Sequence, residues 1–535
     1  MNVSLFLLSL LLSEIYCGVI NDLYKVDIIH YNDFHARFEE TALLYPVCTS
    51  NNTDCLGGFA RLYHEVQTLL KEKPDALVLN AGDVFQGTYW YTLMKWNVTQ
   101  KFINMLPNDA HAIGNHEYDD GPVGLAPYLA ALRAPVLAAN MDTSEEPSLN
   151  GLYKPHIVIE RKGRKIGIIG LITTATASSS NSHNVIFLDP VETARKEAKL
   201  LTDEGVDIII VLSHCGLDVD RKIANEVGEN IDIIVGGHTH SLLWNGDPPS
   251  GENISGPYPI IEKSFKNPNH NVVIVTASAF TKYLGNTTVY FDKTGEMVSY
   301  DGEPVYLNRS IAEDAEMKSL MQPYTDYVHS LVDEVIGTAD ADFLGTMCGA
   351  KECELGNLIA DSFLYAGKQM NVSDLPHVTF LLRNMIRGAF SRGNITRGAI
   401  INALPFTNKL VTLSLPGRYL VEALAHCMDM YWEAKPFNGP WMPQVAGMRV
   451  TLNTVTKTVE VSIKKGVEYV ALDPERNYQV ITMDFLSKGK NGFEMFAEHG
   501  KNVTYIGKDA EILENYIKMS PQVTPHLDNR LTVIN

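Results

Sequence analysis

Five apolar stretches of the chain each end in residues that can bind metal ions. The candidate ligands are Asp33 and His35, Asp83, Asn115, His214, and His238 with His240. Imidazole nitrogens mixed with carboxylate and amide oxygens suit Zn²⁺, Mn²⁺, Fe or Co, whereas Ca²⁺ prefers a shell made only of oxygen. Two such ions about 3.5–4 Å apart activate water and stabilise an in-line displacement at phosphorus. The expected chemistry is hydrolysis of a phosphoester or phosphoanhydride.

The spacing within these clusters indicates separate roles. Asp33 and His35 are two residues apart, so in an extended segment their side chains would point to the same side. Asp83, alone in the turn NAGD, is the candidate to bridge two ions, although a helix N-cap explains this motif equally well when it stands by itself. The pair Gly236–Gly237 before His238 would let backbone and ions approach closely.

The motif GNHEYD combines a metal ligand with a catalytic pair. Asn115 offers a neutral carbonyl oxygen to a metal. We assign His116 to the phosphoryl oxygen of the substrate, with Asp119 orienting its ring and favouring its protonated form. One histidine alone would more often be an ordinary core or surface residue, as we expect for His30 and His111. The recurrence at successive strand ends favours a metal site.

The stretches that lead into the clusters predict the elements that position them. VDIIHY and DIIIVL are short and β-branched, as is typical of buried parallel strands, so the ligands should meet at the carboxyl edge of one sheet. Helical patterns such as FARLYHEVQTLLKE and DPVETARKEAKLLTDEG alternate with these strands and indicate βα units around a mixed or parallel sheet.

A chain of 535 residues is too long for one hydrophobic core. We expect a signal peptide at residues 1–17, a first domain at 25–310, a stiff linking helix at 311–335 and a second domain at 336–535. The second domain combines the helical pattern CELGNLIADSFLYAG with strand patterns such as KLVTLSL and MRVTLN.

Charge and terminal segments favour an extracellular protein. The net charge of −19 argues against nucleic-acid binding. LFLLSLLL is too short to span a bilayer and resembles a secretory signal, with a core helix as the alternative. The carboxyl end, LDNRLTVIN, lacks a lipid-anchor pattern. We therefore expect secretion without a membrane anchor.

Secretion makes disulfides and glycans possible. Two short spacings suit loop-closing bridges, Cys48 with Cys55 and Cys348 with Cys353. Cys215 and Cys427 are expected to be buried free thiols, with a bridge between them as the alternative. A glycoprotein is indicated by eight sequons beyond the expected signal peptide, at Asn51, Asn97, Asn253, Asn286, Asn308, Asn371, Asn394 and Asn502.

Taken in order, HYNDFHARFE, NAGDVFQGT, GNHEYDDG, LSHCG and GGHTH resemble the five metallophosphoesterase blocks of the 5′-nucleotidase/apyrase family. ECELGNLIADSF, RNMIRGAF, NALPFTNKLVTLSL and ITMDFLSKGKNGFEMF extend the resemblance over nearly the whole mature chain. It implies an amino-terminal four-layer α/β dimetal domain, a linking helix, and a carboxyl-terminal α+β nucleotide-binding domain able to rotate towards the metals. The implied metal ligands are Asp33, His35, Asp83, Asn115, His214 and His238, with a variable position at His240, and the implied catalytic pair is His116 and Asp119.

For the second domain, the resemblance implies that the nucleobase stacks between Phe406 and Phe485 while Arg387 contacts phosphate. Stacked rings accept any base. The chain departs from the usual family residues at Gly349, where an arginine is usual, at Leu382, where an asparagine is usual, and at Asn491, which replaces the acid that holds the ribose. A neutral amide accepts hydrogen bonds more weakly than a carboxylate.

The resemblance therefore implies a secreted phosphohydrolase of ATP, ADP or AMP, monomeric or homodimeric. It would hold two divalent ions, Zn²⁺ foremost, with Mn, Co, Mg or Ca as other options. A member without an anchor resembles the salivary apyrases and 5′-nucleotidases of blood-feeding arthropods, which inhibit platelet aggregation by removing ADP. The alternative, motivated by the second-domain departures, is a secreted binding protein with little activity that binds a host haemostatic protein or nucleotides.

Overall fold

A computed structural model describes residues 23–42, 48, 54–433 and 441–534 of the chain. They form two compact units. Met1–Gln86 group with Met94–Leu320, and Gly87–Leu93 group with Met321–Asn535. The signal segment expected at residues 1–17 lies outside the described residues. Among the described helices, none has the length and apolar character needed to cross a bilayer.

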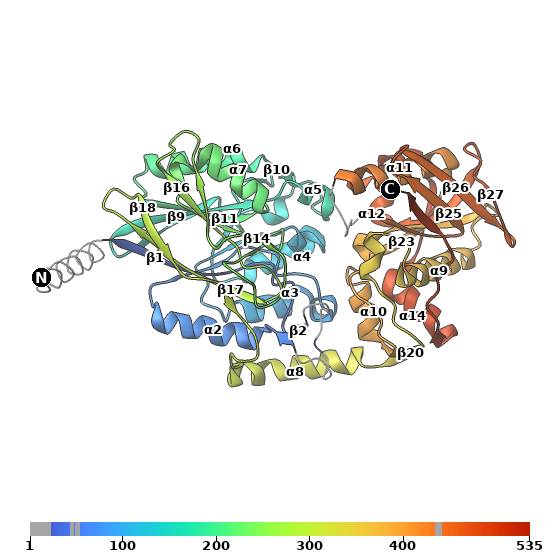
Figure 1. Ribbon diagram of the computed structural model, residues 1–535, viewed down its shortest axis with the longest axis horizontal. Helices are drawn as coiled ribbons and strands as arrows, with labels where there is room; N and C mark the ends of the chain where they lie inside the picture. The colour runs from blue at the N-terminus through green and yellow to red at the C-terminus, as the bar shows by residue number, and fades with distance from the viewer. Residues whose placement is uncertain (1–22, 43–47, 49–53, 434–440, 535) are drawn as a thin grey trace, which may run out of the picture. The chain divides into compact units, whose positions relative to one another are not determined.

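The first unit is built on two large sheets (Figure 1). One has seven strands in the order β18 (Met297–Asp301), β17 (Tyr283–Phe291), β1 (Tyr24–Tyr31), β4 (Leu77–Asn80), β5 (Ala110–Ala112) and β6 (Val136–Leu137), with β19 (Val305–Tyr306) paired to β17. The other has six, in the order β15 (Ile260–Lys263), β16 (Asn271–Val275), β12 (Ile233–Gly236), β11 (Ile208–His214), β9 (Arg164–Ile172) and β8 (His156–Arg161). Both are mixed: β1, for example, is parallel to β4 and antiparallel to β17.

The two sheets pack face to face and share one apolar core, which includes Ile28 of β1 and Ile168 of β9. They come into close contact at Gly170, where a Cβ atom would lie 2.3 Å from the carbonyl oxygen of Leu137. The backbone N–H of Ala139 also donates to the carbonyl of Gly170 across 2.7 Å. Only a residue without a side chain fits this contact.

Helices cover the outer faces of the two sheets (Figure 1). They include α2 (Phe59–Glu72), α6 (Pro190–Asp203) and α7 (Leu217–Val227), and the unit also contains α4 (Gly121–Ala131) and α5 (Thr176–Ser179). The start of α6 shows how the sequence fixes these ends: Asp189 caps it by accepting from the N–H groups of Val191 and Glu192, and Pro190 occupies the first turn. The four-layer α/β arrangement is confirmed.

One expectation was wrong. The candidate ligands do not meet at the edge of a single sheet, because β1, β4 and β5 belong to the first sheet and β11 and β12 to the second. Apolar strand runs show that a strand is buried, but they do not show which strand is its partner, since pairing depends on contacts distant in sequence.

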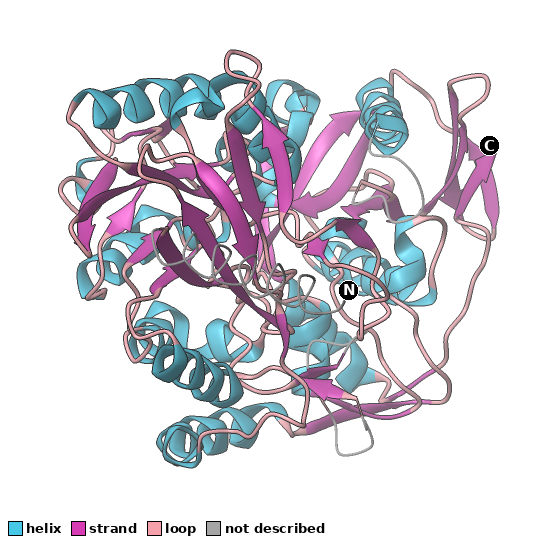
Figure 2. Ribbon diagram, turned by 60° about the vertical axis from the view of Figure 1, so that its left-hand side comes forward, coloured by secondary structure: helices cyan, strands magenta, loops and turns pink. Residues whose placement is uncertain are grey.

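The second unit contains most of α8 (Ala315–Val332), a helix within the segment 311–335. Its central sheet has the order β24 (Pro443–Ala446), β21 (His377–Leu382), β28 (Asn477–Met483), β23 (Lys409–Pro416) and β29 (Lys501–Lys508). A second sheet has the order β27 (Glu468–Ala471), β26 (Thr458–Lys465), β25 (Met448–Asn453) and β31 (Leu531–Ile534), and a third has β22 (Gly393–Thr396), β20 (Val335–Ala339) and β30 (Gln522–Val523). Figure 2 shows the strands in magenta and the helices in cyan. The helices of the second unit include α9 (Glu354–Gln369), α10 (Arg397–Ala403), α11 (Gly417–Glu433), α12 (Asp484–Ser487), α13 (Glu494–His499) and α14 (Asp509–Met519).

A short piece of the amino-terminal half packs with the second unit. It opens α3 (Tyr89–Ile103), which is interrupted at Lys95, where φ is 57°. Trp90 stacks on Tyr324 with ring centroids 6.4 Å apart, and the hydroxyl of Thr92 donates to the carbonyl of Pro405 across 3.3 Å.

The cysteines pair as the spacing predicts. Disulfides join Cys48 to Cys55 and Cys348 to Cys353, while two cysteines, Cys215 and Cys427, are buried and free.

Candidate metal centre

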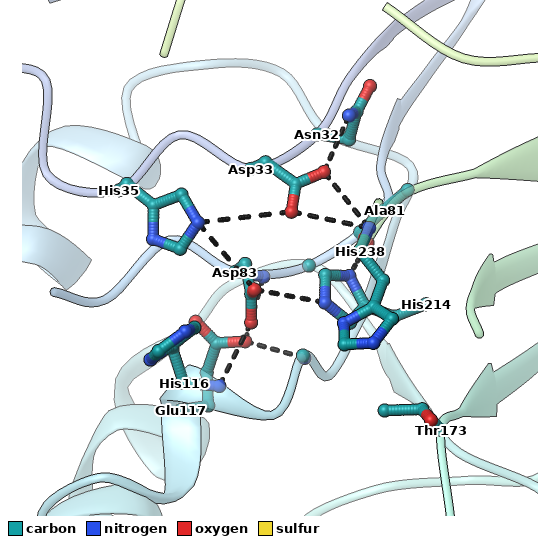
Figure 3. A network of polar contacts seen from close by, with 12 residues as sticks. Asn32, Asp33, His35, Ala81, Asp83, His116, Glu117, Thr173, His214 and His238 are labelled. Carbon is teal, nitrogen blue, oxygen red and sulfur yellow. Dashed lines mark hydrogen bonds and ion pairs between the residues drawn. The ribbon is translucent and has the colours of Figure 1, made fainter. Parts of the chain in front are cut away.

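The candidate ligands lie on the loops that follow five strands. In the first sheet, Asp33 follows β1, Asp83 follows β4 and Asn115 follows β5, and these three strands are mutually parallel in register. In the second sheet, His214 ends β11 and His238 follows β12, and these two strands are also parallel. Two sheet edges thus bring the side chains together (Figure 3).

The backbone of these loops is not extended. Asp33, His35, Asp83 and His238 have φ values of 49°, 47°, 56° and 80°, in the left-handed region that side chains disfavour. The extended Asp33-x-His35 segment expected from the sequence is therefore wrong, although both side chains still face the cluster. Such residues cost about 1–3 kcal/mol each and cluster at functional sites.

Hydrogen bonds between the loops hold these backbone conformations. The N–H of Asp33 donates to the carbonyl of Gly82, and that of His35 donates to the carbonyl of Asp83, both across 3.0 Å. The N–H of His116 donates to Asp83 Oδ1 across 2.9 Å. Asp83 does not cap a helix: the next helix, α3, begins at Tyr89.

Glycines let the loops approach one another. A Cβ on Gly114 would lie 2.0 Å from Asp83 Oδ1, and one on Gly237 would lie 2.8 Å from the carbonyl oxygen of Ala81 and 3.2 Å from Asp33 Oδ2. The close approach expected at the glycine pair is therefore present at Gly237.

Side-chain atoms of types that can bind metal form three overlapping groups whose members lie within 4.8 Å of one another: Asp33 with His35 and His240, His35 with Asp83 and His116, and Asp83 with His214 and His238. Asp83 Oδ2 lies 3.1 Å from His214 Nε2 and 3.7 Å from His35 Nε2. Asp33 Oδ1 lies 3.3 Å from His240 Nε2. Asp83 occupies the position between two groups that a bridging carboxylate requires.

The electrostatics of the cluster favour cations. Burial opposes charge on His214, but the carboxylates of Asp83 and Asp33 outweigh it and raise the pKa of His214 to about 10. Burial lowers the pKa of His35 well below its usual value and lowers that of His238 to about 4. The two buried carboxylates, Asp33 and Asp83, thus create a negative field, while the neutral imidazoles of His35 and His238 offer lone pairs.

The donor set fits divalent metal ions. Asn115 is buried, and its Oδ1 accepts no hydrogen bond from any residue in the described parts of the chain. An isolated buried carbonyl oxygen is costly unless it has a partner. Together with two carboxylates and several imidazoles, this oxygen completes a set of N and O ligands typical of Zn²⁺ or Mn²⁺.

His116 and Asp119 form a second functional pair beside the cluster. Asp119 Oδ2 lies 2.7 Å from His116 Nδ1, and the His116 side chain is 21% exposed whereas that of Asp83 is 2% exposed. Burial raises the pKa of the Asp119 carboxyl, opposed by His116. His116 is therefore held by a carboxylate and partly exposed, whereas Asp83 is buried.

Three further residues support the cluster and were not found from the sequence. Asn32 donates to Asp33 Oδ2 and to the carbonyl of Ser278, both across 2.6 Å. The ring of Phe280 lies 5.5 Å from that of His35, and its N–H donates to the carbonyl of Asp33. Glu117 is buried, and burial together with Asp83 raises its pKa to about 7. Only the last could have been suspected, as an acid inside GNHEYD.

His30 and His111 are core residues, as expected. His30 is fully buried against the hydroxyl of Tyr258, 3.0 Å away, and His111 lies 3.1 Å from the amide of Asn80.

The candidate nucleotide-binding residues lie in the second unit. The guanidinium of Arg387 lies 5.0 Å from the ring centre of Phe406, so these two are brought together. Phe485 lies in α12 and is partly buried, and Asn491 has a left-handed backbone with its carbonyl 3.0 Å from His426 Nε2. The stacking of a base between the two phenylalanines stays a prediction, as do the roles assigned to all candidate site residues.

Two packed sheets with oxygen and nitrogen ligands gathered at their edges define a metallophosphoesterase. Residues 26–242 match the calcineurin-like phosphoesterase family, and residues 335–498 match the 5′-nucleotidase carboxyl-terminal domain. The chain belongs to the 5′-nucleotidase/apyrase family.

Relatives match over nearly the full length. An apyrase from Tabanus yao is 38% identical over 96% of this chain and 94% of its own. A snake venom 5′-nucleotidase from Gloydius brevicauda is 33% identical over 95% of this chain and 88% of its own. The crystal structure of a 5′-nucleotidase precursor from Thermus thermophilus superposes with a TM-score of 0.84, at 33% identity over 96% of this chain and all of that one. The chain is thus a metal-dependent nucleotide phosphohydrolase.

Proposed function

We propose that the protein is secreted and hydrolyses extracellular ATP, ADP or AMP, releasing orthophosphate. The arrangement of Asp83 between two groups of ligand atoms, with His116 and Asp119 beside it, carries this proposal. The ligands are Asp33, His35, Asp83, Asn115, His214 and His238, with His240 on the exposed side. Two divalent ions, Zn²⁺ foremost, would supply Lewis acidity for the phosphoryl group.

His116 binds the phosphoryl oxygen in this proposal. Its Nδ1 faces Asp119, and in this proposal its Nε2 donates a proton or a hydrogen bond to the phosphoryl group. Asp119 keeps the ring in one orientation, which limits the reorganisation needed when charge develops on the phosphoryl group. Phe406 and Phe485 bind the base and Arg387 binds phosphate, while Asn491 holds the ribose less strongly than an acid would.

A nucleotide panel tests the proposal. Phosphate release from ATP, ADP and AMP is measured with Zn²⁺, Mn²⁺, Mg²⁺ and Ca²⁺ in turn, for the wild type, Asp83→Ala and His116→Ala. We expect turnover by the wild type that both substitutions abolish. Wild-type rates no higher than those of the two variants, with every nucleotide and metal, would refute the enzyme and favour a secreted binding protein on the same scaffold.

The preferred nucleotide is resolved by a second variant. Gly349 lies where an arginine is usual, so we expect Gly349→Arg to change the ratio of the ATP, ADP and AMP rates.

We further propose that removal of ADP lets the secreted protein inhibit platelet aggregation. Platelets stimulated with ADP that has first been incubated with wild-type protein should aggregate less than platelets given ADP incubated with Asp83→Ala.

A further inference from the structure

The carboxylate of Glu117 joins the two loops that follow β4 and β5. Its Oε1 accepts from the N–H groups of Val84, across 2.7 Å, and Phe85, across 3.0 Å. Its Oε2 accepts from the N–H groups of Asp83, across 3.0 Å, and Gly114, across 2.5 Å. Figure 3 shows the side chain directed at these loops. Both oxygens are therefore occupied by backbone donors, which leaves Glu117 poorly placed to act as a ligand itself.

These contacts fix the backbone of the bridging candidate. Asp83 has φ of 56°, in the left-handed region that residues other than glycine adopt infrequently and at some energetic cost. In that conformation the N–H groups of three successive residues all donate to the one side chain of Glu117. The N–H of His116 then binds Asp83 Oδ1 from the side, across 2.9 Å. Glu117 fixes the turn, and His116 fixes the carboxylate.

From this geometry we propose that Glu117 is a positioning residue that holds Asp83 in the orientation needed to bridge two metal ions. The inference rests on the proposed dimetal function. In this proposal Glu117 acts through Asp83 and contacts neither substrate nor metal, which distinguishes it from His116.

The test uses Glu117→Gln. The amide keeps the size of the side chain but turns one acceptor into a donor that faces two backbone N–H groups, so about half of the contacts to the turn are lost. Asp232→Asn is the matched control. Asp232 is also buried and accepts a backbone N–H, from Ile209 across 2.8 Å, but it precedes β12 and so lies at the opposite end of that strand from His238.

Mn²⁺ is the probe, and no nucleotide is needed. Binding is followed by calorimetry, and paramagnetic resonance distinguishes a magnetically coupled pair of Mn²⁺ ions from isolated ones. We expect Glu117→Gln to bind Mn²⁺ at least about 10-fold more weakly and to lose the coupled spectrum. Asp232→Asn should retain both the affinity and the spectrum of the wild type.

Other outcomes would overturn the proposal or separate it from the proposed function. The proposal is overturned if Glu117→Gln still binds a coupled pair of Mn²⁺ ions with the wild-type affinity. It is also overturned if Asp232→Asn loses as much Mn²⁺ affinity and coupling as Glu117→Gln. Glu117→Asp keeps the charge but is one methylene too short to reach both loops, and we expect it to fold and to lose the coupling. If both Glu117 variants fail to fold without metal, Glu117 serves the fold instead. A wild type that binds a coupled pair but hydrolyses no nucleotide would refute the proposed function alone.

Discussion

Substitution of Gly114 by alanine tests the geometry around Asp83 with one methyl group. The new Cβ would lie 2.0 Å from Asp83 Oδ1 and 2.4 Å from Asp83 N. A comfortable contact is roughly 3.5 Å, so the Asp83 turn must retreat by more than about 1 Å. Gly114 is not among the residues with a left-handed backbone, so an alanine is acceptable there apart from this collision.

The expected cost falls on activity more than on folding. A displacement of about 1 Å in a catalytic arrangement lowers the rate about 10²-fold. Overpacking lowers the free energy of unfolding by about 1–3 kcal/mol. We therefore expect Gly114→Ala to remain folded and to release phosphate from AMP or ADP about 10²-fold more slowly at saturating Mn²⁺.

Gly167→Ala is the control, because it crowds the core without touching the cluster. Its Cβ would lie 2.8 Å from Leu201 Cδ1 and 3.2 Å from Val206 Cγ1, methyl groups that can move aside. We expect it to lower the melting temperature and leave turnover unchanged. If Gly114→Ala turns over at the wild-type rate, the tight contact between the two loops is not what places Asp83.

Two further predictions concern single carboxylates. Asp119→Asn should lower kcat by about 10²-fold while metal content stays at the wild-type level, because Asp119 orients His116 and binds no metal; a parallel loss of metal would contradict this role. Burial raises the pKa of Asp509 to about 7, far above its value of about 3.9 in the unfolded chain, so the folded state holds the extra proton. Its contribution to the free energy of unfolding is present below about pH 4 and is lost as the pH rises to about 7, by up to about 1.4 kcal/mol per pH unit. Urea denaturation at pH 5 and pH 8 measures the free energy of unfolding. It should fall less between these two pH values for Asp509→Asn than for the wild type, and an equal fall would refute the raised pKa of Asp509.

The order of the motifs predicted that these side chains lie near one another, because each candidate ligand ends a strand or follows it within a few residues; their binding of metal stays a prediction. A strand boundary is a local property of the chain, and so is the cluster of polar residues after it. His214 at the end of β11 and Asp83 shortly after β4 are examples. The second-unit elements around α9 and β23 could be predicted for the same reason.

The sequence could not reveal the features that depend on distant contacts. β1 pairs with β17, which lies far along the chain, and the sequence of neither strand identifies the other as its partner. The left-handed conformation of Asp33 was hidden too, since it is imposed by bonds to Gly82 and Phe280. The sequence around Glu117 also does not show whether its carboxylate accepts hydrogen bonds from backbone N–H groups or binds metal.

The pairing of β1 with β17 also determines when the centre can first exist during synthesis. β1 is the first strand of its sheet to leave the ribosome, but its neighbour on one side is completed only at Phe291. The histidines of the second sheet likewise emerge long after Asp33. Because domains fold as units once their chain is available, a partly made chain holds only fragments of the ligand set. The ligand set of the metal centre can therefore be assembled only late, when nearly all of the first unit has been translated.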